Sequence, residues 1–287
     1  MKKILVLFVL LLLTTPSFAA DYTQYCSAGK ANPTLLGNLG SLTGINFISR
    51  NIMEGQISNA IKKEVNSKFN VDLDSFFGVN VLNGEFKGLK ASTDNFNFDG
   101  LAASKVAVET LCPYNRVGFN GEKLVLKENM VLKYDTEINQ SDLNKIASSA
   151  KYLKIIEKIN KDSKISSLVK VTGSNLQLDN NKLILNYSIT PVLGQGILSR
   201  LASATTFNLS FSTGLKAEKG ELKLCNFALN SKKIGLDALL PLVNKFNPLT
   251  YGLKLGETNK GTIQIDNVTI ANSKIKIDGT VLLPKEE

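Results

Sequence analysis

Hydrophobic residues recur along this chain with two different spacings, which change from one segment to the next. Between residues 42 and 69 they recur every three or four positions, and this spacing predicts an amphipathic helix. The same spacing predicts a second helix over 142–159, with Ser141 as its N-cap and lysines at its carboxyl end. A third, shorter stripe predicts a helix over 236–246.

Elsewhere hydrophobic and polar residues alternate in short runs separated by Gly, Asn and Asp, which predicts an antiparallel meander. The predicted strands are 79–81, 85–89, 96–98, 106–111, 117–119, 124–134, 168–171, 176–178, 183–189, 207–211 and 222–229. A change of phase after Leu224 predicts a β-bulge in the last of these. The segment 262–284 predicts a hairpin that turns at 271–273.

The order of these elements is helix, meander, helix, meander, helix, hairpin. It predicts an α+β fold with an elongated, strongly curved antiparallel β-sheet wrapped around amphipathic helices. We expect a signal peptide at 1–19, an irregular Gly- and Pro-containing lead-in at 20–41, and a single domain at 42–287.

The first 19 residues have the layout of a secretory signal peptide. Lys2 and Lys3 form a charged start, an apolar run covers 4–13, and small residues lead to a cleavage site after Ala19. The run is shorter than the roughly 20 residues that span a membrane, although an uncleaved anchor stays open as an alternative. We therefore expect an exported protein of the periplasm or cell envelope.

Three cysteines in an oxidising compartment predict one disulfide and one leftover thiol. Cys26 lies near the mature start, and Cys112 precedes a proline at a turn. Cys225 lies inside a strand pattern, where a cysteine behaves as a small buried apolar residue. The favoured bridge is Cys26–Cys112.

The charge of the chain is basic and dispersed. Without Lys2 and Lys3, 32 of the 34 basic residues remain beside 25 acidic residues, which gives a formal charge of +7. Such a surface suits an anionic membrane or wall polymer better than nucleic acid, and simple solubility explains it equally well.

The residue types argue against catalysis. The chain has no histidine, which excludes Ser-His-Asp and Cys-His sites and histidine-ligated zinc. The carboxylate pairs Asp72/Asp74 and Asp135/Glu137 are most simply solvated strand faces. We expect no enzyme, no cofactor and no metal.

Several stretches resemble the LmeA-like phospholipid-binding family of exported bacterial proteins. The resemblance is carried by FKGLKASTDNFNFDGLAASKVAVET, KYDTEINQSDLNKI, FNPLTYGLKL and TIQIDNVTIANSKIKIDGTVLLP. It implies a relative of tubular lipid-binding proteins, in which a curved sheet cups a helix and encloses phospholipid. The family pattern fixes no catalytic residue. This chain departs from it in its three cysteines and in a Lys- and Ser-rich insert at 151–167.

The expected partner is therefore a phospholipid or another acyl lipid, with an anionic membrane surface as a second expected partner. An acyl chain is featureless, so its site requires a contiguous set of large apolar side chains. The candidate contacts are Leu143, Ile146, Leu236, Leu240, Val243 and Phe246. For any single one of them, core packing is the favoured interpretation. The alternative function is a structural cell-envelope adaptor with a filled core that binds a protein partner.

Overall fold

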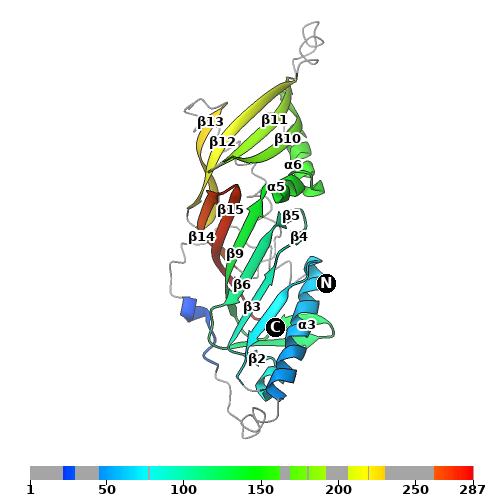
Figure 1. Ribbon diagram of the computed structural model, residues 1–287, viewed down its shortest axis with the longest axis vertical. Coiled ribbons are helices and arrows are strands. Elements are labelled where there is room, and N and C mark those ends of the chain that lie inside the picture. The colour runs from blue at the N-terminus through cyan, green and yellow to red at the C-terminus, as the bar shows by residue number, and fades with distance from the viewer. Residues whose placement is uncertain are drawn as a thin grey trace.

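The fold of the chain is α+β, and every strand pair among the described residues is antiparallel. The structure is a computed structural model that describes residues 22–29, 45–76, 78–161, 169–179, 181–191, 206–218, 220–229 and 262–286. Figure 1 shows an elongated molecule in which two large sheets follow one another along the long axis, with helices along one side. The predicted α+β class, the antiparallel pairing and the elongated form are confirmed.

The larger sheet has six strands in the order β1-β3-β6-β9-β15-β14. Their bounds are Asn70–Asp74 for β1, Gly88–Thr93 for β3, Lys105–Thr110 for β6, Met130–Asn139 for β9, Lys274–Leu283 for β15 and Thr262–Ala271 for β14. The C-terminal hairpin thus lies beside β9, with Val281 opposite Leu132 and Ile275 opposite Ile138.

The second sheet is a four-stranded meander, in the order β10-β11-β12-β13. Its strands are Val169–Asp179, Lys182–Pro191, Phe207–Glu218 and Glu221–Leu229. The expectation of one continuous sheet is therefore corrected to two sheets. They meet where the Ile265 amide of β14 donates a hydrogen bond to the Gly220 carbonyl, at 3.0 Å.

Two small sheets and a short helix complete the strand-rich part. They are β2 (Glu85–Phe86), β7 (Asn115–Asn120) and β8 (Lys123–Leu126), then β4 (Phe96–Phe98) and β5 (Leu101–Ala103). The strand predicted at 79–81 is wrong, because these residues belong to helix α4, Gly78–Leu82. Five residues are too few for spacing to distinguish a helix from a strand. The run predicted at 124–134 divides into β8 and β9.

The first long helix is α3, Ile45–Val65. Its buried stripe follows Met53, Ile57, Ile61 and Val65. Ile48 and Ile52 follow the hydrophobic spacing that predicts this helix, but they do not lie on its buried face and are 59% and 50% exposed. Each precedes a buried position by one residue, which is about 100° around a helix of 3.6 residues per turn.

The predicted helix at 142–159 is two helices, α5 (Gln140–Ala147) and α6 (Ala150–Lys161). The N-cap of α5 is Asn139 rather than Ser141. The Asn139 side chain accepts a hydrogen bond from the Asp142 amide, and the Asp142 carboxylate accepts one from the Asn139 amide, both at 3.0 Å. The helix is interrupted at Ser148–Ser149. The Ser149 hydroxyl accepts a hydrogen bond from the Tyr152 amide and so caps the start of α6.

Two predictions of local strand geometry are confirmed. The register of β12 with β13 shifts between Ser212 and Gly214, and Asn226 has a positive φ of 52° at the extra position on β13. The C-terminal hairpin turns through Asn272 and Ser273, both with positive φ, as in a type I′ turn.

The outer face of the six-stranded sheet is charged. Lys90 pairs with Glu109 at 3.1 Å, and Glu137 accepts from Lys274 at 2.9 Å and Lys276 at 3.2 Å. These two lysines hold the pKa of the Glu137 carboxyl below its ordinary value. The sheet therefore has a single apolar face, which is turned inward.

Candidate functional site

The inward faces of the two sheets form the interior of the molecule. In the six-stranded sheet the buried positions alternate along β15, and on β14 they include Ile265 and Val268. In the four-stranded sheet Leu176 lies opposite Leu185, and Leu185 lies opposite Phe211. These residues belong to one hydrophobic cluster that runs from one sheet into the other.

Two of the predicted lipid-contacting residues, Leu143 and Ile146, lie on the inner side of α5. Their exposed fractions are 0% and 2%. The helix begins directly after β9 and packs against β10 and β5, so both side chains lie where the two sheets meet. The structure brings these two residues together in the core, and their contact with an acyl chain stays a prediction.

The other four predicted contacts are on the helix expected at 236–246. Leu236, Leu240, Val243 and Phe246 lie outside the described residues. Their role also stays a prediction.

Three tyrosines place hydroxyl groups in this interior. The Tyr134 hydroxyl donates a hydrogen bond to the Gln264 carbonyl at 3.3 Å. Tyr152 of α6 forms hydrogen bonds with Tyr187 of β11 and with Ser174. Burial raises the pKa of all three phenols. They are therefore neutral hydrogen-bonding groups at physiological pH.

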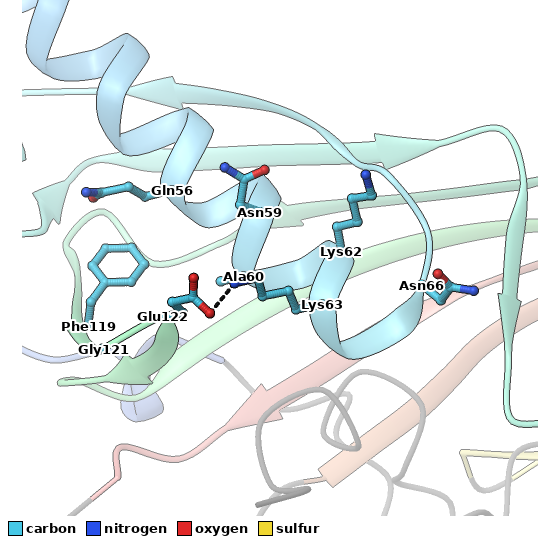
Figure 2. Close-up of a pocket in the computed structure, with 9 residues that line it drawn as sticks. All are labelled: Gln56, Asn59, Ala60, Lys62, Lys63, Asn66, Phe119, Gly121 and Glu122. Carbon is cyan, nitrogen blue, oxygen red and sulfur yellow. Dashed lines mark ion pairs between the residues drawn. The ribbon is translucent and has the colours of Figure 1, made fainter.

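A groove lies on the surface, between the carboxyl half of α3 and the turn that joins β7 to β8. It has a volume of about 600 Å³. Its lining residues, drawn in Figure 2, are Gln56, Asn59, Ala60, Lys62, Lys63, Asn66, Phe119, Gly121 and Glu122. We call this the α3 groove. It contains none of the predicted lipid-contacting residues.

The polar groups of the α3 groove come mainly from one side of α3. Gln56, Asn59 and Lys63 recur at helical spacing, and Asn66 follows the last turn with a positive φ of 52°. Lys63 forms an ion pair across the groove with Glu122 of the β7–β8 turn. The sequence spacing shows the amide and lysine face of α3, but not that the β7–β8 turn lies beside it.

The thiol chemistry agrees with the sequence prediction. Cys26 and Cys112 form a disulfide with a Cα–Cα distance of 5.4 Å, and Cys225 is a free, half-buried cysteine. Burial raises the pKa of the Cys225 thiol.

The described part of the chain has neither a cluster of metal ligands nor a membrane-spanning helix. His, Cys, Asp and Glu side chains form no group of three or more there that is able to hold a metal ion. No helix of that part combines the length and the apolar character needed to cross a membrane.

Comparisons with known proteins gave no relative. No family model, no curated protein and no solved structure matches the chain. The function therefore has to be argued from the residues themselves.

Proposed function

We propose that this is an exported lipid-binding protein that holds the acyl chains of a phospholipid against the inner faces of its sheets. The observation that carries the proposal is the hydrophobic cluster that continues from the four-stranded into the six-stranded sheet along an elongated molecule. A long apolar interior matches the shape of an acyl chain, which gains roughly 0.8 kcal/mol for each CH₂ that it buries.

The inner face of β14 and β15 is the part of this interior best suited to the lipid. The described helices make their main strand contacts elsewhere, α3 with β1, and α5 and α6 with β10. Ile265, Ile277 and Val281 are buried on a stretch of sheet on which no described helix is centred, and β14 is contacted there by β12 and β13. Its lining is aliphatic, as an acyl chain requires.

A structural cell-envelope adaptor with a filled core is the second candidate. The observation that favours it is the close packing of the interior, where Leu143, Leu176, Leu183 and Leu185 are 0% exposed. A core filled to this degree along its whole length leaves no room for a ligand.

Mass spectrometry of organic extracts from the purified mature protein separates these two functions. The proposal predicts a phospholipid in a stoichiometric amount, whereas the adaptor carries none. A protein purified from its exporting host without bound lipid, and unable to take up phospholipid from vesicles, would contradict the proposal.

Ile277→Trp locates the lipid. In an open interior the indole fills ligand space, so lipid content falls and the free energy of unfolding of the lipid-free protein changes little. In a filled core the same change forces overpacking and lowers that free energy by about 1–3 kcal/mol. Lys276→Trp, one position along on the outer face, is the matched control and leaves lipid content unchanged.

A further inference from the structure

We propose that the α3 groove binds a neutral sugar, as a short stretch of glycan of about two or three rings. This site is separate from the interior and does not depend on the proposed lipid function. Nothing in the sequence expectations assigned a ligand to these residues.

The size of the groove suits such a ligand. Its volume of about 600 Å³ lies inside the range of roughly 300–1,000 Å³ that small-molecule sites occupy. Figure 2 shows the helix as one wall of the groove and Phe119, Gly121 and Glu122 as the other. An open groove admits an internal segment of a chain as well as its end.

The hydrogen-bonding groups match sugar hydroxyls. Each hydroxyl both donates and accepts, and so does each side-chain amide. Gln56, Asn59 and Asn66 contribute three such amides along one wall, and all three side chains are exposed. The Lys63–Glu122 ion pair adds a donor and an acceptor on the facing walls.

Phe119 supplies the apolar part of the site. Its ring is half-buried in β7 and lies in the wall opposite Gln56. The face of a sugar ring that carries C–H groups is apolar and packs well on an aromatic ring, whose π-face is negative. A groove of amides with one aromatic wall therefore recognises both faces of a sugar.

The charges argue against a phosphate or another anion. Glu122 neutralises Lys63, so that among the described residues of the lining Lys62 is the one uncompensated cation. Both lysines belong to the last turn of α3, where the helix dipole places negative partial charge. An anion would thus be repelled by Glu122 and by the carboxyl end of the helix, whereas a neutral ligand would not be repelled.

The test is a titration of the mature protein, followed by amide NMR, with chitotriose and maltotriose as neutral probes. We expect at least one sugar to bind with a Kd of about 1 mM and to shift the side-chain amides of Gln56 and Asn59. The affinity should be the same at low salt and at about 0.5 M salt, because salt screens interactions between charges and the probe sugars are neutral. Inorganic phosphate is the anionic probe and should produce no saturable shift.

Variants make the test specific. Asn59→Ala and Phe119→Ala should each weaken sugar binding about fivefold to tenfold, the effect of losing one hydrogen bond or one ring contact. Asn51→Ala, at an exposed position of α3 outside the groove, is the matched control. Glu122→Gln should change sugar affinity less than about threefold, whereas it would strengthen the binding of an anion.

Two outcomes overturn the proposal. One is the absence of localised shifts from both sugars at about 50 mM, far above the expected Kd. The other is saturable, salt-sensitive binding of phosphate that Glu122→Gln strengthens, which would make the groove an anion site.

Discussion

Two side-chain amides form hydrogen bonds with the backbone of β10, which is an edge strand of its sheet. The Gln140 amide donates to the Leu176 carbonyl and accepts from the Leu178 amide, both at 2.7 Å. Asn160 of α6 makes the same pair of bonds with Val171, both at 2.8 Å. An unpaired strand edge is a template for aggregation, so these amides take the place of a fifth strand.

We expect Gln140→Ala to lower the free energy of unfolding by about 1–3 kcal/mol, because it leaves two backbone groups of β10 unpaired. Urea denaturation measures the loss, and faster hydrogen exchange at Leu178 localises it. Gln177→Ala, at an exposed position of the same strand, should leave both unchanged. Equal losses in the two variants would mean that strand propensity, not the edge bonds, sets the cost.

Two glycines are expected to respond to alanine with opposite signs. A Cβ at Gly279 would lie 2.0 Å from the Gln264 carbonyl and 2.7 Å from the Tyr134 hydroxyl, so Gly279→Ala should cost about 3 kcal/mol or more. At Gly55, in α3, a Cβ meets nothing within 4 Å. Gly55→Ala should therefore raise the free energy of unfolding by about 0.5–1 kcal/mol. Thermal unfolding of both variants checks the two signs, and a stabilised Gly279→Ala would contradict the packing described around Tyr134.

At the scale of elements, α5 depends on its first turn. Asn139 ends β9 in an extended conformation and caps the helix. The Asp142 carboxylate, only 3% exposed, accepts a hydrogen bond from the Asn139 backbone amide. This capping box fixes the direction in which α5 leaves the six-stranded sheet toward β10.

We expect Asn139→Ala to lower the free energy of unfolding by about 1 kcal/mol through loss of this cap. Ser141→Ala should have little effect, although Ser141 was the N-cap expected from the sequence. Chemical denaturation of the two variants compares them directly. The reverse order of costs would restore Ser141 as the cap.

Residue spacing predicts some of these features and fails to predict others. Alternation over ten residues was enough for the C-terminal hairpin and for the bulge near Asn226, because period and turn residues agree there. Spacing did not separate Asn139 from Ser141 as the cap, because both are good capping residues two positions apart. It also missed the α3 groove, since the approach of the β7–β8 turn is a long-range contact that no local pattern records.

Helix α6 carries the charge that an anionic membrane would meet. Lys154, Lys158 and Lys161 lie on one exposed face, and among the described residues none of them forms an ion pair, whereas Lys90, Lys274 and Lys276 on the outer sheet face are all paired. Lys158 and Lys161 also complement the dipole at the carboxyl end of the helix.

We expect the protein to bind vesicles that contain phosphatidylglycerol and to leave them as salt is raised. Changing Lys154, Lys158 and Lys161 to Gln should lower partitioning about 100-fold, since each lysine near the surface contributes about 1 kcal/mol. The same change at Lys90, Lys274 and Lys276 is the matched control and should cost much less. Vesicle co-sedimentation measures both, and equal losses would show that net charge alone drives binding.

At the scale of the whole molecule, the two large sheets are joined by the packing of β12 against β14 and by the elements that cross between them. The Ile265–Gly220 hydrogen bond links the sheets, and α5 packs where they meet. Near the start of the described residues, the Cys26–Cys112 disulfide links the segment 22–29 to the rest of the fold. The molecule is therefore held at its junction by packing and at its amino end by a covalent bond.

The disulfide closes a loop between cysteines 86 residues apart, so its removal should cost much of the stability of the protein. Loop-closure entropy gives about 4–5 kcal/mol for the Cys26→Ser/Cys112→Ser double variant, measured by urea denaturation. Cys225→Ser should cost less than about 1 kcal/mol, because the half-buried thiol makes no bridge.

Alkylation checks that this pairing forms in the protein in solution. Without reductant the native protein should be labelled at Cys225 alone, and slowly, because the thiol is half-buried and burial raises its pKa. Raising the pH should speed the reaction by increasing the thiolate fraction, at a higher pH than for an exposed cysteine. Unfolding in denaturant should remove the delay and still leave Cys26 and Cys112 unlabelled until a reductant is added. Labelling of Cys26 in the native, unreduced protein would contradict the bridge and, with it, the assignment of the amino end to the body of the fold.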